Sequence, residues 1–225
     1  MLEGLPVVAW DLFAPEFGLI YGYDDAAQLL YAEDSASKGT IPYDRFGRGM
    51  SGGLFLLSVT GEMPIEEWEA VRSSLDMAVR HAYGEWTFVG YVCGLTAYEC
   101  WSEAFRRRSV DPLGNAYTAE VAADARRHAA LFIRELERKL LKNGRKEAAD
   151  MAAEAACLYE QIEAALGEFS RLFPFPDGGS PNEPALAEKA IGLLSKALAA
   201  ETAGIEALER LSRCIALTIN EEAGR

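Results

Sequence analysis

Hydrophobic and polar residues follow two different periods along this chain. Up to about residue 60, short apolar runs are separated by turn-forming residues, a pattern typical of β-strands. From Pro64 onward, apolar residues recur every three or four positions, which predicts amphipathic helices. The sequence therefore predicts a small β region over residues 1–61 and a larger helical region over residues 62–225.

The first region contains short apolar runs that predict strands over residues 5–12, 17–23, 28–32 and 53–59. Asp24-Asp25 is a good turn pair, so the second and third runs should pair in antiparallel fashion. The connection over residues 34–52 carries Gly, Pro and Ser, and we expect no regular element in it. A sheet of this size is marginal by itself, so we expect it to pack against the helical region.

The second region predicts long helices over residues 64–82, 95–108, 116–142, 145–173 and 184–219, and either a strand or a helix lead-in from Trp86 to Val92. Asn143-Gly144 is a natural helix stop. Short connections favour antiparallel packing. The helix over 116–142 should bury Val121, Ala125, Phe132, Leu136 and Leu140. The predicted fold class is α+β, with the small antiparallel sheet packed on a larger antiparallel helical part.

Charge and composition restrict the partners. The 225 residues include 35 acidic and 22 basic side chains, which gives a net charge of -13. Such a surface repels phosphates, so nucleic acid and anionic membranes are poor partners. No apolar run approaches the roughly 20 residues of a membrane span, and the N-terminus lacks the features of a signal peptide. The irregular cysteine spacing suggests free thiols in a reducing cytoplasm, at Cys93, Cys100, Cys157 and Cys214.

Few residues form recognisable catalytic sets. Zinc, EF-hand, Walker and dinucleotide-binding patterns are absent from the sequence, so we expect neither a metal nor a cofactor. His81 and His128 fall inside predicted helices, where we expect structural roles. Cys93 would lie near a helix N-terminus, where a thiol can be activated, but a small buried apolar residue is the alternative. Cys157 and Cys214 fall within helical stripes and are expected in the core.

Two acidic residues occupy informative positions. Glu16 lies just before the second strand, at the mouth of the sheet, and is either a site residue or a solvated loop residue. Glu201 falls on the apolar face of the last helix, between Leu198 and Ile205. A carboxylate there must find a partner or be neutralised, so we expect a structural ion pair with an arginine.

A family resemblance covers most of the chain. The segments from Pro15 to Asp25 and from Leu30 to Asp34 resemble the histidine-bearing strand pair of papain-like folds of the C39-peptidase type. They look closest to the butirosin-biosynthesis acyltransferase H family and its uncharacterised relatives. Further similar segments are Ile41-Pro-Tyr43, Gly94 to Tyr98 with Trp101, the pattern of Arg126, Ala129 and Phe132, and Leu172 to Pro176. The resemblance implies that residues 1–61 are half of a papain-like domain.

The chain departs from this family at the residues that matter most. Glu16 stands where the family places its histidine, and a carboxylate cannot supply the imidazolium that stabilises a thiolate. Asp34 matches the residue that would orient the histidine. No cysteine precedes Glu16, although the family's nucleophile lies upstream of this strand. Since the chain begins almost at once with a strand, we expect that Met1 is not the natural start; the nucleophile half is encoded separately, removed or naturally absent.

Two classes of function follow. In the first, the chain is a non-catalytic binding or assembly protein, and apolar sheet residues such as Val7, Leu19 and Leu56 support a homo-oligomer. In the second, it supplies part of a cysteine-dependent acyltransferase or amide-cleaving enzyme that another segment or chain completes. The candidate catalytic residues are Glu16, Asp34 and Cys93, and the candidates for lining a ligand are Trp10, Tyr21 and Tyr43. The first class is favoured, because nucleophile and histidine are both missing from their expected places.

Overall fold

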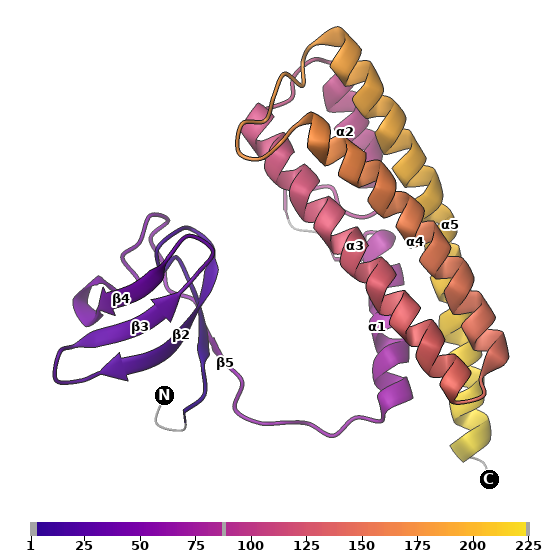
Figure 1. The fold of residues 1–225 in the computed structure, drawn as a ribbon, viewed down its shortest axis with the longest axis horizontal. Helices are drawn as coiled ribbons and strands as arrows, with labels where there is room; N and C mark the ends of the chain where they lie inside the picture. The colour runs from indigo at the N-terminus through magenta and orange to yellow at the C-terminus, as the bar shows by residue number, and fades with distance from the viewer. Residues whose placement is uncertain (1–3, 87–88, 224–225) are drawn as a thin grey trace. The chain divides into compact units, whose positions relative to one another are not determined.

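The computed structural model describes residues 4–86 and 89–223 of the chain (Figure 1). Contacts divide the chain into two compact units, Met1–Pro64 and Ile65–Arg225. The first, which we call the sheet unit, is built from β-strands, and the second, the helical unit, is built from α-helices. The predicted α+β class is therefore confirmed.

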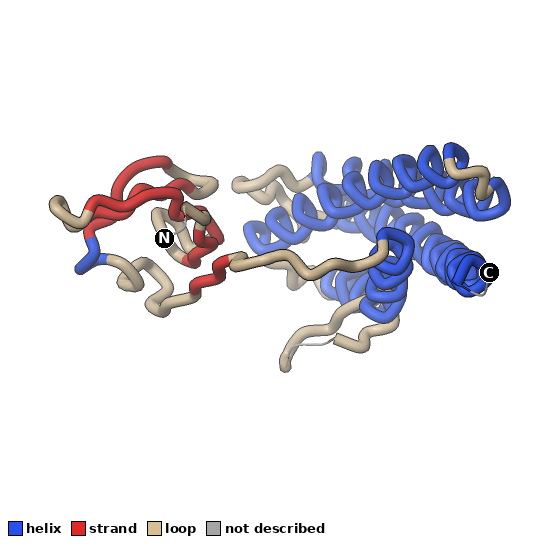
Figure 2. Tube along the Cα trace, turned by 90° about the horizontal axis from the view of Figure 1, so that it is seen from below, coloured by secondary structure: helices blue, strands red, loops and turns tan. Residues whose placement is uncertain are grey.

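The sheet unit is an antiparallel sheet with the strand order β4-β3-β2-β1-β5. Its described strands are β1 (Val7–Trp10), β2 (Phe17–Asp24), β3 (Leu29–Glu33), β4 (Lys38–Pro42) and β5 (Leu56–Ser58). They curve in the tube view of Figure 2. Strand β4 and the short 3₁₀-helix Tyr43–Arg45 lie inside the 34–52 connection, so the expectation of no regular element there was wrong. Pairing with β3 orders a segment whose Gly and Pro give little local strand preference.

The sheet unit has a small core on one face of the sheet. Its fully buried apolar side chains are Ala9, Ile20, Ala32 and Ile41. Ala9, Ile20 and Ala32 belong to predicted strands, in which alternate side chains point to the same face of the sheet. Ile41 comes from the unpredicted strand β4. Since the sheet unit has this core of its own, the expected packing of the sheet against the helices stays a prediction.

The helical unit contains α1 (Glu67–Ala82), α2 (Thr96–Arg106), α3 (Pro112–Lys142), α4 (Lys146–Leu172) and α5 (Pro184–Ala223). Helix α3 starts earlier than predicted, because Pro112 is tolerated in the first turn and the Asp111 carboxylate accepts a hydrogen bond from Gly114 N–H at 2.7 Å. Gly144, with φ of 72°, ends α3 as predicted. None of the described helices is long and apolar enough to cross a membrane.

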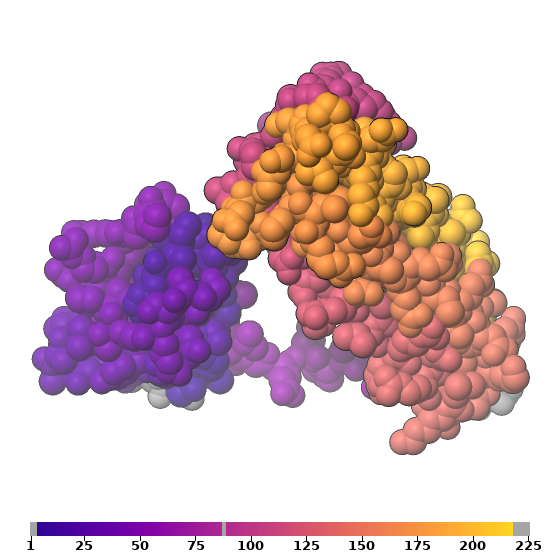
Figure 3. All heavy atoms as spheres, turned by 45° about the horizontal axis from the view of Figure 1, so that its top comes forward, coloured from indigo at the N-terminus to yellow at the C-terminus, as the bar shows by residue number. Residues whose placement is uncertain are grey.

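The connection from α1 to α2 contains the segment from Trp86 to Val92, predicted as a strand or helix lead-in. Residues 87–88 lie outside the described residues, and the rest of the segment forms turns and coil. The predicted antiparallel packing is seen for α3 against α4 and for α4 against α5 (Figure 1). Their atoms meet along much of their length in the space-filling view (Figure 3).

Aromatic rings fill the centre of the helical unit. Phe105, Phe169 and Phe173 are each fully buried. The Phe169 ring lies 4.9 Å from the Trp101 ring, 5.7 Å from Phe105 and 5.2 Å from Phe173, between centroids. Edge-to-face contacts of this kind add to the free energy gained from burying the ring area. The core thus joins α2 to α4 and to the chain that follows α4.

The buried face of α3 differs from the prediction. Val121, Ala125 and Phe132 are exposed, and only Leu136 and Leu140 of the predicted set are buried. The observed buried apolar side chains are Ala116, Ala119, Ala130, Ile133, Leu136 and Leu140. Because α3 is rich in alanine, its apolar period fits two adjacent faces, and close packing selects the face with the small residues. His128, expected to have a structural packing role beside the apolar stripe, is exposed as well.

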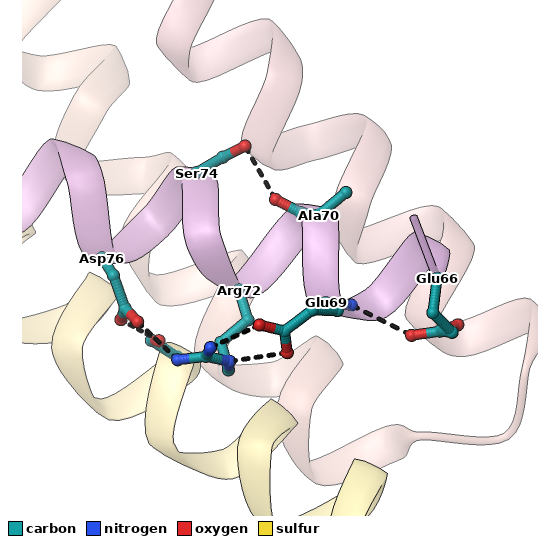
Figure 4. Close-up of polar contacts among 7 residues, drawn as sticks. Glu66, Glu69, Ala70, Arg72, Ser74 and Asp76 are labelled. Carbon is teal, nitrogen blue, oxygen red and sulfur yellow. Dashed lines mark hydrogen bonds and ion pairs between the residues drawn. The ribbon is translucent and has the colours of Figure 1, made fainter. Parts of the chain in front are cut away.

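Polar contacts fix the start of α1 and its orientation on α5 (Figure 4). The Glu66 carboxylate caps the helix by accepting a hydrogen bond from Glu69 N–H at 3.0 Å. Arg72 then bridges Glu69, at 3.0 Å from its Nε, and Asp76, at 2.7 Å from its Nη1. Asp76 also accepts a hydrogen bond from the Ser212 hydroxyl on α5. The row therefore links α1 to α5 beside the buried Trp68 and Leu75.

Candidate functional site

Asp34 organises two loops of the sheet unit. Its Oδ2 accepts hydrogen bonds from the N–H groups of Phe13 at 2.8 Å and Ala14 at 2.9 Å. Its Oδ1 accepts from Ala36 and Ser37, both at 2.9 Å. Partial burial opposes ionisation, but these backbone donors outweigh it and lower the pKa of Asp34. Both oxygens are thus engaged by the backbone, which gives this candidate catalytic residue a structural role.

Glu16, the second candidate catalytic residue, is half-buried in the bend before β2. Its backbone carbonyl accepts a hydrogen bond from Asp11 N–H at 2.9 Å, and its own N–H donates to the Ala14 carbonyl at 2.7 Å. Because Asp34 holds the N–H groups of residues 13 and 14, the same loop carries Glu16 and contacts Asp34. The sheet unit therefore contains two of the three candidate catalytic residues.

Cys93, the third candidate, belongs to the helical unit. It is half-buried and precedes Gly94, whose φ of 70° is in the left-handed region that favours glycine. The next residue, Leu95, donates its N–H to the Ala82 carbonyl at 2.8 Å and so fixes this turn against the end of α1. All four cysteines are free thiols, as predicted, but Cys157 is exposed rather than in the core.

Asp11 is a buried carboxylate that the sequence did not single out. Its oxygens accept hydrogen bonds from Met50 N–H at 3.1 Å, Ser51 N–H at 2.7 Å and the Ser51 hydroxyl at 2.6 Å. The Ser51 hydroxyl is the main cause of the lowered pKa of Asp11, and the backbone N–H groups add to it. Gly49 has no side chain, and a Cβ there would collide with the Asp11 carboxylate. The glycine-dense stretch over residues 47–53 was the available signal, because carboxylates often bind such exposed N–H groups.

The three aromatic candidates for lining a ligand do not share a site. Trp10 donates its indole N–H to the Ser51 hydroxyl at 2.7 Å. Tyr21 is exposed in an irregular step of β2, with the Lys38 ammonium 5.0 Å from its ring centroid. Tyr43 donates its hydroxyl to Asp25 at 2.8 Å, which raises its pKa to about 12. Tyr43 also lines a hollow of about 280 Å³ beside Ile20, on the core side of the sheet.

The other face of the sheet carries a continuous row of paired side chains, which we call the outer row. Strand register places Leu57 beside Val8, Val8 beside Leu19, Leu19 beside Glu33, and Glu33 beside Lys38. Leu57 is 51% exposed and Leu19 46% exposed. The row therefore has a wide apolar part on β5, β1 and β2, and a charged part on β3 and β4.

Aromatic rings extend the apolar part of the outer row. Phe17, opposite Trp10 in the register, is 54% exposed. Its ring centroid lies 4.9 Å from Trp10 and 5.4 Å from Phe55. Exposed apolar groups that are contiguous, unlike single exposed residues, are typical of interaction surfaces. The sheet unit can therefore bind a partner surface by apolar burial, with ionic contacts at one side.

No family model matches this chain, and no curated protein is similar to it in sequence. The resemblance to papain-like acyltransferases therefore stays a prediction from short motifs. Among the described residues, no group of three or more His, Cys, Asp or Glu side chains could hold a metal ion.

Proposed function

We infer that this chain is a non-catalytic binding and assembly protein, related to papain-like acyltransferases, that associates with a second copy through the outer row. The observation that carries the inference is the exposed apolar part of that row, with Phe17 54% exposed and Leu57 51% exposed. Burial of such side chains is the main favourable contribution to protein association. Val7 and Leu56, first expected to contribute, lie on the core side of the sheet instead.

Local charge does not oppose the binding of a second copy at this surface. The chain carries a net charge of -13, which repels an identical chain at long range. In the outer row, however, Glu33 and Lys38 form a 2.7 Å ion pair, so the row has no net charge. A two-fold interface brings each row against its own copy, and the same pair can then exchange partners across the interface.

The roles of the candidate catalytic residues support a binding function over catalysis. Asp34 uses both carboxylate oxygens to hold backbone N–H groups, which leaves it poorly suited to orient a catalytic base. The free thiols support the proposed cytoplasmic location, since a reducing compartment keeps them unpaired.

The test is the oligomeric state of the full chain at micromolar concentrations, measured by sedimentation velocity. We expect a dimer for the wild type and a dissociation constant at least about tenfold weaker for the double variant Phe17→Ser, Leu19→Ser. Met50→Ser is the matched control, because Met50 is 79% exposed in the same unit but lies outside the outer row. A monomeric wild type, or equal association of all three proteins, contradicts the proposed assembly.

The non-catalytic part of the proposal has its own test. Because Cys93 is half-buried, we expect iodoacetamide to alkylate it no faster than the exposed Cys100 at neutral pH. Mass spectrometry of peptides at short reaction times measures both rates in one sample. Alkylation of Cys93 far ahead of Cys100 would favour the alternative, in which the chain supplies part of a cysteine-dependent acyltransferase or amide-cleaving enzyme.

A further inference from the structure

The helical unit contains a cavity of about 320 Å³, lined by side chains from α1, α2, α3, α4 and α5. Its walls are mostly short and apolar, because six alanines line it: Ala78, Ala82, Ala97, Ala122, Ala125 and Ala129. Trp101 and Ile205 complete the apolar lining. The hollow opens to solvent at Thr118 and Ala125, which are exposed, so a small molecule can enter it from outside. Concave, mostly apolar hollows of this kind are candidate binding sites.

A buried ion pair forms the inner polar part of the lining, and the exposed His81 of α1 lines the cavity as well. The Glu201 carboxylate, on α5, is in a residue only 4% exposed. Arg126, on α3, donates from Nε to Oε1 at 3.0 Å and from Nη2 to Oε1 at 2.5 Å. The Tyr98 hydroxyl, on α2, also donates to Glu201. The expectation that Glu201 finds an arginine partner is confirmed, and the pair links three helices at the wall of the cavity.

The electrostatics of this lining favour a ligand without net charge. Burial opposes the charge on Arg126, but the neighbouring Glu201 carboxylate outweighs it and raises the pKa of Arg126. Burial first, and then the same carboxylate, raise the pKa values of Tyr98 and Tyr159, so both hydroxyls stay protonated. The two charges of the pair cancel. The carboxylate of Glu201 would repel an anionic ligand, and the guanidinium of Arg126 would repel a cationic one. Neither charge is available to bind a ligand ion, because each is already neutralised by its partner.

Tyr159, on α4, offers an unused hydrogen-bonding group to this cavity. The residue is 5% exposed and lines the cavity. Its ring packs against Gly204 of α5, where an added Cβ would come within 3.1 Å of the ring. Within the part of the chain that the structure describes, its hydroxyl makes no hydrogen bond, whereas Tyr98 donates to Glu201 and Thr118 donates to the Gly114 carbonyl. This hydroxyl is not among the buried polar atoms that lack a partner, so it borders the open space of the cavity and can donate to a molecule bound there.

A purely structural role does not explain why an ion pair is buried at this cavity. Replacing a buried pair with packed apolar residues is often neutral or stabilising, and leucines at the alanine positions would fill the hollow. Here the pair, the six small side chains and the unused Tyr159 hydroxyl border the same space. This coincidence distinguishes a built site from a packing defect.

We propose that the cavity binds a compact neutral molecule with an apolar body and one carbonyl or hydroxyl oxygen, which accepts a hydrogen bond from Tyr159 and lies beside Arg126. The apolar body occupies the alanine-lined part. At about 30 Å³ for each water-sized group, the volume holds on the order of ten non-hydrogen atoms. The inference rests on the helical unit and is independent of self-association by the sheet unit.

Two isosteric probes test the ligand class on the full chain. Phenylacetamide is neutral, and phenylacetate has the same shape with a negative charge. By titration calorimetry we expect phenylacetamide to bind in the millimolar range and phenylacetate at least about tenfold more weakly. Equal or tighter binding of phenylacetate overturns the assignment of a neutral ligand. No heat from phenylacetamide at its solubility limit overturns the site.

Variants locate the probe. Ala122→Leu should abolish phenylacetamide binding by filling the cavity, whereas Ala164→Leu, at an exposed position of α4 outside it, should leave binding unchanged. Tyr159→Phe removes only the hydroxyl and should weaken binding about fivefold, even where the leucine variant folds poorly. Unchanged binding by Tyr159→Phe overturns the proposed contact. The Phe17→Ser, Leu19→Ser variant should bind the probe like the wild type, which separates this site from the assembly surface.

Discussion

The two units of this chain differ in how much of their apolar surface they bury. The helical unit buries large aromatic and aliphatic side chains from all its described helices, with Phe169 and Leu166 fully buried. The sheet unit buries only small or medium apolar residues, such as Ala9 and Ile20, and leaves Phe17 and Leu19 exposed. A smaller chain segment has more surface for its volume, so it cannot cover all of its apolar groups.

Polar groups also serve the two units differently. In the sheet unit, Asp11 and Asp34 bind backbone N–H groups of loops and so substitute for missing core contacts. In the described part of the helical unit, the carboxylates of Glu66 and Asp111 bind backbone N–H groups only at helix starts. The buried Glu201 carboxylate contacts Arg126 instead. The comparison indicates that carboxylates maintain the fold of the small unit, while the large unit can accommodate an ion pair and a cavity.

The largest expected effect is on the core of the helical unit. Phe169→Ala should lower the free energy of unfolding of this unit by about 3–5 kcal/mol, because the ring contacts of Trp101, Phe105 and Phe173 are lost. Urea denaturation followed by far-ultraviolet circular dichroism measures it. Phe132→Ala is the control, since Phe132 is 47% exposed and should cost less than about 1 kcal/mol. Equal losses for both variants would contradict the observed face of α3.

The buried ion pair should give the next largest effect. Arg126→Met leaves the Glu201 carboxylate without its cation, and we expect a loss of about 2–3 kcal/mol, less than for a fully buried pair because the arginine side chain is 29% exposed. The double variant Arg126→Met, Glu201→Leu should recover most of that stability. Thermal or urea denaturation measures the free energy of unfolding of the single and the double variant.

The matched control for this pair is Arg127→Met. Arg127 pairs with Asp124 on the exposed side of α3, at 2.6 Å, and should contribute less than about 0.5 kcal/mol. If the double variant is no more stable than Arg126→Met, the loss comes from arginine packing rather than from the uncompensated carboxylate.

The smallest expected effect is on the loops of the sheet unit. Asp34→Ala removes an acceptor from four backbone N–H groups and should destabilise this unit by about 2 kcal/mol. Hydrogen exchange of peptides from residues 17–42 should accelerate, while peptides of α4 should be unaffected. Asp44→Ala, at an exposed carboxylate, is the control. Equal acceleration in α4 would show that the two units unfold together.

Acid should act on the same contacts. The pKa values of Asp11 and Asp34 are lowered from 3.8 in the folded protein, so their stabilisation is complete above that pH and is lost as the pH falls below it. The protection factors of the sheet peptides, which correct for the intrinsic pH dependence of amide exchange, should therefore fall below pH 3.8, and less steeply in Asp34→Ala. A wild type and variant with the same acid dependence would exclude this role of Asp34.

Much of the secondary structure could be predicted from local pattern. The long helices and the four apolar strands follow from the periods of 3.6 and 2, because each element buries one face and the pattern records that face. Strand β4 could not be predicted, since Lys38–Pro42 has weak strand preference and is ordered by pairing with β3. The prediction of the buried face of α3 was wrong for a similar reason. Alanine positions such as Ala119 and Ala125 are equally apolar, and only packing against other helices decides which of them is buried.

The candidate sites show the same limit. The sequence could predict that Glu201 has an arginine partner, because a carboxylate on an apolar helix face requires a cation or a hydrogen-bond donor. Which arginine, and the Tyr98 hydroxyl beside it, depend on contacts across 75 and 103 residues of sequence. Asp34 was singled out for a family motif, yet its contacts with Phe13 and Ala14 give it a structural role.

The sequence by itself determined the two regions, the antiparallel arrangement, the acidic surface and the buried acid at Glu201, since each follows from residue types within a short window. The tertiary structure decided which apolar faces are covered, where the outer row is exposed, and that Ala122, Tyr159 and Glu201 border one cavity. The physical reason is that burial and pairing are properties of contacts between distant segments, and these contacts exist only once the helices and strands have packed.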